Sequence, residues 1–199
     1  STSSAIIILL LVGSLTGTWL ISGIIPAMIV YGVEMLNAEF FLLASCIICA
    51  IVSIATGSSW ATIATIGIAL MAIGNVLTIS PGLVAGSIIS GAYFGDKMSP
   101  LSDTTNLAAA MAETDIFAHI KYMMYTTIPS FIITLIIFLI IGFTFENSTE
   151  YSTPTIVSAI EASKLKIDNL WLFIVPITVV ILILKKLPAI QSLLIGTIL

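Results

Sequence analysis

Apolar residues run along this sequence in long unbroken stretches, and the few charged residues are gathered between them. No charged residue occurs before Glu34, between Glu39 and Asp96, or between Lys121 and Glu146. The stretches do not alternate between polar and apolar positions, so they predict helices rather than the strands of a barrel. A helix crosses the hydrocarbon core of a bilayer in about 20 residues, which makes these stretches candidate membrane spans.

The first part of the chain predicts a bent span and then a broken one. The bent span covers Ala5–Val33, where several glycines and Pro26 are typical of helices that bend or pack closely in a membrane. The uncharged stretch that follows is too long for two plain spans, and Thr56–Ser59 interrupts it with small polar residues. We therefore predict that Phe40–Ala55 and Trp60–Ile73 are half-helices, or parts of a broken span, that meet at Thr56–Ser59.

A shorter apolar segment precedes the most polar part of the sequence. Pro81 is placed to begin a helix, and apolar residues continue from Leu83 to Phe94. As a helix this segment would rise roughly 18 Å, about half the thickness of a bilayer. The length predicts a half-span that stops at Gly95 and leaves Asp96 well inside the membrane.

Two elements are predicted after the polar run. Glu113–Lys121 has the composition of a short interfacial helix, for which Thr114 is a candidate cap. The apolar residues Tyr122–Phe145 predict a long span, with a bend at Pro129 because proline removes a helical hydrogen bond.

The only substantial polar loop covers residues 146–168. It is followed by a span at Asn169–Leu184 and by Pro188, which opens a further helix. Lys121 and Lys185 lie at the far ends of the two spans that flank the loop, hence on one side of the membrane. Lysines favour the cytoplasmic side, so the loop is predicted to be extracytoplasmic.

Composition supports this interpretation. Hydrophobic residues make up 59% of the 199 residues and charged residues only 8%, with a mean hydropathy of +1.21. A soluble domain carries about a quarter charged residues, so no water-soluble fold could cover this apolar surface. The net charge of −4 is spread thinly, and the lack of a basic patch argues against nucleic acid as a partner. We predict an all-α polytopic integral membrane protein.

Residues 1–199 are predicted to form one membrane transporter domain that is incomplete at both ends. The chain begins at Ser1 without an initiator Met and stops at Leu199 inside an apolar run. We therefore expect an internal segment of a longer transporter, which the remaining part would complete.

The strongest chemical signal is the run Gly91–Asn106. Its last eleven residues carry two carboxylates, one ammonium group, four hydroxyls and a carboxamide between two apolar segments. Carboxylates inside a membrane are costly and usually mark ion pathways or proton relays. Ser99 is placed to cap a helix that begins at Pro100, which would leave free backbone groups in the break. The alternative is a polar loop, because Asp, Ser, Pro and Asn are ordinary turn residues.

Sodium prefers hard oxygen ligands, and this run offers them. A carboxylate in a dry site can hold a proton or a sodium ion but not both, and this competition is enough for an exchanger. We predict sodium at Asp96, Asp103 and Ser99. Lys97 is either a counter-charge that keeps one aspartate ionised or a side chain that snorkels to the interface.

A second polar element with candidate ligands is Thr56–Thr62. Read as a helix break, it exposes carbonyls at one end and hydroxyls at the other. The alternative is that its hydroxyls only hold helices together. The candidate ion-binding residues are Asp96, Ser99, Ser102, Asp103, Thr104, Thr105, Asn106, Thr56, Ser58, Ser59 and Thr62.

The sequence resembles the NhaC family of sodium–proton antiporters. The resemblance lies in Gly17-Thr18-Trp19, in Thr56-Gly57-Ser58-Ser59-Trp60 with Thr65–Ala69, and above all in Gly91–Asn106. Ile120-Lys121-Tyr122 and Tyr125–Pro129 fit as well, so the likeness covers roughly residues 17–142.

The resemblance implies a multi-pass protein of the bacterial inner membrane that exchanges sodium for protons and is built from inverted repeats with hairpins or broken helices. It carries over as site residues Asp96, Ser99, Asp103, Thr104 and Asn106, with Thr56, Ser58 and Ser59 opposite them. It implies no cofactor beyond the transported ions and leaves open whether the transporter is a homodimer. The same family includes exchangers that couple sodium and protons to malate and lactate, and such an organic acid antiporter is the alternative. An enzyme is not expected, because the sequence lacks a nucleophile–base pairing.

Overall fold

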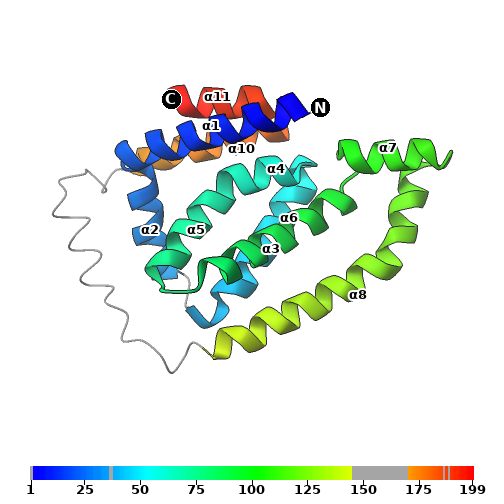
Figure 1. The fold of residues 1–199 in the computed structure, drawn as a ribbon, viewed down its shortest axis with the longest axis horizontal. Helices are drawn as coiled ribbons and strands as arrows, with labels where there is room; N and C mark the ends of the chain where they lie inside the picture. Colours follow the sequence, from blue (N-terminus) through cyan, green and yellow to red (C-terminus); the bar gives the residue numbers. More distant parts are fainter. Residues whose placement is uncertain (1, 36–37, 145–169, 186, 188) are drawn as a thin grey trace.

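The computed structural model describes residues 2–35, 38–144, 170–185, 187 and 189–199, and the regular structure of these residues is entirely helical (Figure 1). Three helical segments among them are long and apolar enough to cross a membrane: Ala38–Thr56, Ser59–Val76 and Ile116–Phe143. The predicted all-α, polytopic fold is therefore confirmed. The predicted loop at residues 146–168 lies outside the described residues.

The predicted bend in the first span is a break between two helices. Helix α1 covers Thr2–Ile21 and α2 covers Ile24–Met35. Gly23 lies between them with a φ of +87°, a conformation that favours glycine. Pro26 sits in the first turn of α2, where its missing N–H costs no helical hydrogen bond.

The next two helices form a hairpin rather than a pair of half-helices. Helix α3 covers Ala38–Thr56, and its partner runs without a gap through α4 (Ser59–Thr62), a π-helical stretch at Ile63–Gly67 and α5 (Ile68–Val76). The two arms have 19 and 18 residues, so each is about 27–29 Å long and of full length. The prediction of half-helices was wrong, because the turn needs only two residues and leaves both arms intact.

Helix α6 covers Pro81–Met98 and lies along α3 (Figure 1). It begins at Pro81, as predicted, but it does not stop at Gly95. That glycine faces α3 instead, where an added Cβ would overlap the carbonyl oxygen of Ala50 and lie 2.5 Å from the Cβ of Ser53. Gly95 therefore serves close packing and not chain reversal. Since α6 has 18 residues, or about 27 Å, the argument that a half-span buries Asp96 fails.

Helices α7 (Asp103–Met111) and α8 (Ile116–Phe143) follow. The predicted interfacial helix is not separate, since α8 continues through Pro129 to Phe143. Its cap is Asp115 and not Thr114, because the Asp115 carboxylate accepts hydrogen bonds from the backbone N–H groups of Phe117 (2.9 Å) and Ala118 (3.1 Å). At its other end α8 returns to the start of α3, where the rings of Phe143 and Phe40 meet edge to face.

The last described helices lie beside the first one. A 3₁₀ turn at Leu170–Phe173 leads into α10 (Ile174–Leu184), and α11 covers Ala189–Ile198. Figure 1 shows α1, α10 and α11 together along the hairpin end that carries α4. The indole N–H of Trp19 donates to the carbonyl of Gly196 at 3.0 Å and joins the two ends of the chain.

Candidate functional site

Two interruptions of the helical backbone touch each other at one end of the bundle. The first separates α3 from α4 at Gly57 and Ser58, and the second separates α6 from α7 at residues 99–102. Gly57 has a φ of +70°, and a Cβ placed on it would lie 2.6 Å from the carbonyl carbon of Leu101. The backbone of Thr56–Ser59 therefore directly contacts the backbone of the second polar run.

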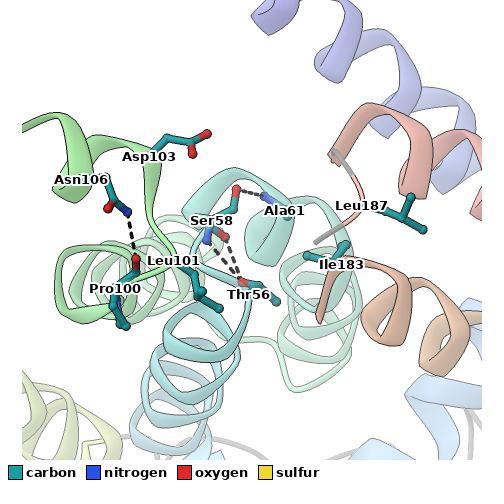
Figure 2. Close-up of a pocket in the computed structure, with 10 residues that line it drawn as sticks. Thr56, Ser58, Ala61, Pro100, Leu101, Asp103, Asn106, Ile183 and Leu187 are labelled. Atoms are coloured by element: carbon teal, nitrogen blue, oxygen red, sulfur yellow. Dashed lines mark hydrogen bonds between the residues drawn. The ribbon is translucent and has the colours of Figure 1, made fainter. Parts of the chain in front are cut away.

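The hydroxyls of the first interruption are bonded to one another and to its backbone. The Ser58 hydroxyl accepts from the N–H of Ala61 at 3.3 Å and caps α4. The Thr62 hydroxyl donates to the carbonyl of Ser58 at 2.9 Å and lies 3.4 Å from the hydroxyl of Thr56. Figure 2 shows the bonds that Ser58 makes with Ala61 and Thr56. The structure thus brings together Thr56, Ser58 and Thr62, as predicted.

Ser99 links the second interruption to the first. Its buried hydroxyl donates to the carbonyl of Ile54 at 2.7 Å and accepts from the N–H of Leu101 at 3.2 Å. Ile54 lies in the last turn of α3, where carbonyls lack helical partners. The prediction that Ser99 caps a helix starting at Pro100 was wrong, because no helix begins there and the next one, α7, starts at Asp103.

Helix α7 instead begins at Asp103 with Ser102 as its cap. The Ser102 hydroxyl accepts from the N–H of Thr105 at 3.4 Å and lies 2.9 Å from the hydroxyl of Thr104. The side-chain amide of Asn106 donates to the carbonyl of Ser102 at 2.7 Å. This cap aims α7 sideways from α6, so the two predicted carboxylates lie on different helices.

Asp96 lies in the last turn of α6 and is half-buried. Its Oδ2 accepts a hydrogen bond from the hydroxyl of Ser59 at 2.9 Å, and its carbonyl accepts one from the hydroxyl of Thr105 at 3.2 Å. The C-terminal end of a helix carries partial negative charge and disfavours a carboxylate. A bound cation would relieve this repulsion.

Asp103 occupies a different place, at the edge of a cavity of about 590 Å³ between α4, α7 and the end of α10 (Figure 2). Its side chain is exposed, and Asn106 lies nearby on the same helix. The residues that line the cavity are Thr56, Gly57, Ser58, Ala61, Pro100, Leu101, Asp103, Asn106, Ile183 and Leu187. Asp96 is not one of them, so the two aspartates have separate surroundings.

Lys97 faces away from both aspartates. It is exposed and lines a second cavity with residues of α8, and no ion pair joins Lys97 to Asp96 or Asp103 in the described structure. Its role as a counter-charge stays a prediction.

Three contributors were not predicted from the sequence. The Ser53 hydroxyl is buried and donates to the carbonyl of Ala92 at 2.6 Å, which fixes α6 against α3 just before the two interruptions. Its helical spacing from Thr56 was the available signal. Ile183 and Leu187 also line the large cavity. Both lie in apolar sequence, and nothing there indicates a contribution to the site.

Within the described residues, no three or more His, Cys, Asp or Glu side chains are grouped closely enough to hold a metal ion. A cation here would depend on one carboxylate together with hydroxyl and carbonyl oxygens. Helix interruptions that carry such oxygens are the construction of secondary transporters, and the fold and site place the chain in that class of membrane protein.

Comparison with known proteins gives the family. A family model described as the Na⁺/H⁺ antiporter family matches residues 91–199, more than half of the chain. The chain is 44% identical over 96% of its length to the Na⁺/H⁺ antiporter NhaC of Alkalihalophilus pseudofirmus, and 40% over 97% to NhaC of Bacillus subtilis. It is 42% identical over 98% of its length to a malate-2H⁺/Na⁺-lactate antiporter of Bacillus subtilis. The chain therefore belongs to the Na⁺/H⁺ antiporter family.

These relatives are longer proteins, since the chain spans 41%, 43% and 42% of their lengths. They are named as antiporters and not as enzymes, and with the apolar helices they make this chain part of the multi-pass proteins of the bacterial inner membrane. No solved structure matches the chain.

Proposed function

We propose that the protein exchanges sodium for protons across the membrane, with Asp96 as the carboxylate for which the two ions compete. The observation that carries this proposal is the 2.9 Å hydrogen bond from the Ser59 hydroxyl to Asp96, which ties a carboxylate of one helix interruption to the other. A sodium ion between the two groups would be coordinated by the carboxylate and by the oxygen of the neutral hydroxyl, whose proton would turn away from Asp96. The family of the chain supports the exchange itself.

The surroundings of Asp96 suit a site that holds either a proton or a sodium ion, but not both. The Ser59 hydroxyl beside the carboxylate supplies a further oxygen atom, the kind of ligand that a hard cation prefers. A proton on the carboxylate would remove its charge and its attraction for sodium. Protonation on one side of the membrane and sodium binding on the other would then alternate at one group.

Asp103 and Asn106 have a second role in this proposal. Both are exposed on α7 and line the large cavity beside Thr56 and Ser58. An acidic cavity edge attracts cations from water and delivers them to the interruption behind it. Ser99, Ser102, Thr104, Thr105 and Thr62 hold the two interruptions in shape by the bonds described above.

An organic acid antiporter is the second candidate, because one relative of comparable identity is named for malate and lactate. Another relative, 40% identical over 69% of the chain, is named an arginine/ornithine antiporter of Halobacterium salinarum. The large cavity argues for a cation there, since its lining, among the described residues, includes the carboxylate of Asp103 and no basic side chain.

The test uses the purified transporter in liposomes that contain a pH-sensitive dye. An inward sodium gradient should cause proton efflux, and Asp96→Asn should abolish it while the protein keeps its melting temperature. Asp103→Asn should lower the rate at low sodium more than at saturating sodium. Normal exchange in Asp96→Asn would refute the proposed site, and a pH change that requires malate or lactate would favour the second candidate.

A further inference from the structure

A second polar cleft lies on the side of α6 that faces α8. Helix α6 contributes Ser90, Tyr93, Phe94 and Lys97, and α8 contributes Thr127, Ser130, Phe131 and Thr134. In both helices the spacing is i, i+3, i+4 and i+7, which places each set on one helical face. Two faces of the same pattern thus oppose each other, and six of their eight side chains are polar in otherwise apolar surroundings.

Two aromatic rings separate the polar groups of this cleft. Phe94 and Phe131 occupy the same position of the pattern, and their rings stack with centroids 3.8 Å apart at an angle of 11°. The stack holds α6 and α8 together and leaves a cavity of about 240 Å³ beside it. Pockets for drug-sized ligands begin at about 300 Å³, so this cavity suits a smaller molecule.

The hydroxyls of the cleft divide into two groups. Those of Ser90, Ser130 and Thr134 donate to carbonyls of their own helices at 2.7, 3.0 and 2.9 Å. The hydroxyls of Tyr93 and Thr127 make no hydrogen bond to any described residue, so both can donate to a ligand. With the three N–H groups of Lys97, the cleft offers five donor hydrogens without an acceptor among the described residues.

Lys97 determines the charge of that ligand. It lies in the last turn of α6, where the helix end favours a cation. Among the described residues the cleft is lined by no acid, so Lys97 has no ion-pair partner within it. We propose that this cleft binds the carboxylate group of a small organic acid, with Lys97 as the ion-pair partner and Tyr93 and Thr127 as hydrogen-bond donors.

This inference deepens the second candidate function and rests on it. It also separates the two ligands in space, because Asp96 and Lys97 are adjacent in sequence but face different helices. Asp96 bonds to Ser59 of α4, whereas Lys97 lines the cleft against α8. A cation and an organic anion could therefore occupy opposite faces of α6 in the same transport cycle.

The experiment measures equilibrium binding of radiolabelled malate and lactate to the transporter purified in a lipid-free sugar detergent. The wild-type protein should bind at least one of them. Lys97→Gln should weaken binding roughly tenfold or more, because a charged hydrogen bond is lost. Lys97→Arg should retain most of it, and Lys121→Gln, which alters an exposed lysine outside the cleft, should have no effect.

Two further measurements keep the outcome clear. Tyr93→Phe combined with Thr127→Val removes both free hydroxyls at nearly constant volume and should weaken binding even if Lys97→Gln does not fold. Binding is also measured in the absence of sodium, so a failure of sodium exchange does not count against the cleft. Undiminished binding in Lys97→Gln, no binding by the wild type, or binding of inorganic phosphate alone would each overturn the proposal.

Discussion

The hydroxyl of Ser59 lies 2.9 Å from Oδ2 of Asp96, and this bond connects the first turn of α4 to the last turn of α6. Its two partners are 37 residues apart in sequence and belong to different helix interruptions. Ser59 itself is buried, so the bond is shielded from water at one end. In the proposed exchange, sodium binding breaks this hydrogen bond and brings the hydroxyl and carboxylate oxygens into contact with the ion.

Ser59→Ala should raise the sodium concentration for half-maximal exchange by about tenfold. The substitution removes an oxygen ligand and the donor that orients Asp96, and hydrogen bonds to charged groups are worth about 1.5–3 kcal/mol. Sodium-dependent dye quenching in proteoliposomes measures the shift. Ser80→Ala is the matched control, since Ser80 precedes α6 without a capping bond from its side chain. A mutant with unchanged sodium dependence would mean that Ser59 has no part in ion binding.

Gly95→Ala should destabilise the protein by about 1–3 kcal/mol, the usual cost of overpacking. An added Cβ would overlap the carbonyl oxygen of Ala50 and push α6 away from α3. Gly86→Ala, in the same helix, is the control, because a Cβ there meets nothing within 4 Å. Thermal unfolding in detergent compares the two mutants. Equal melting temperatures would show that α6 and α3 are less closely packed than the structure has them.

Gly57→Ala should impair both stability and sodium affinity. The left-handed backbone of Gly57 costs about 1–2 kcal/mol for a residue with a side chain, and the new Cβ would press on Leu101. Separating the two interruptions would also lengthen the contact between Ser59 and Asp96. Gly82→Ala serves as control, since the nearest atom to its Cβ would be 3.9 Å away. Melting and sodium titration are measured on the same samples, and loss of stability with normal affinity would assign Gly57 a folding role alone.

The elements that could be predicted from the sequence were those with a local physical cause. Pro81 starts α6 because its ring fixes a helical φ and its missing N–H is not needed there. The interruption at Gly57–Ser58 was visible as small polar residues within apolar sequence, and the polar run at Asp96–Asn106 was visible by composition. Each of these signals lies within a few residues of the feature that it marks.

Helix lengths and cap assignments failed where distant contacts decide. Gly95 looks like a helix end until α3 is placed beside it. Ser99 looks like a helix cap, but its hydroxyl bonds to the carbonyl of Ile54 and the next helix begins only at Asp103. The separate surroundings of Asp96 and Asp103 depend on the direction of α7, which the cap at Ser102 sets. The contribution of α10 to the large cavity could not be predicted, because the sequence of an apolar span does not indicate which helices pack against it.

The large cavity makes a prediction about chemical access. Asn106→Cys should react rapidly with a water-soluble maleimide, because Asn106 is exposed and lines the cavity beside Thr56 and Ser58. Ala109→Cys, one turn away on α7 and only 3% exposed, should react slowly and serves as the control. The native Cys46 and Cys49 are fully buried, so the wild-type protein should give little background. Sodium should slow the labelling of Asn106→Cys if the ion reaches Asp96 through this cavity, whereas labelling that is indifferent to sodium would place the ion's route elsewhere.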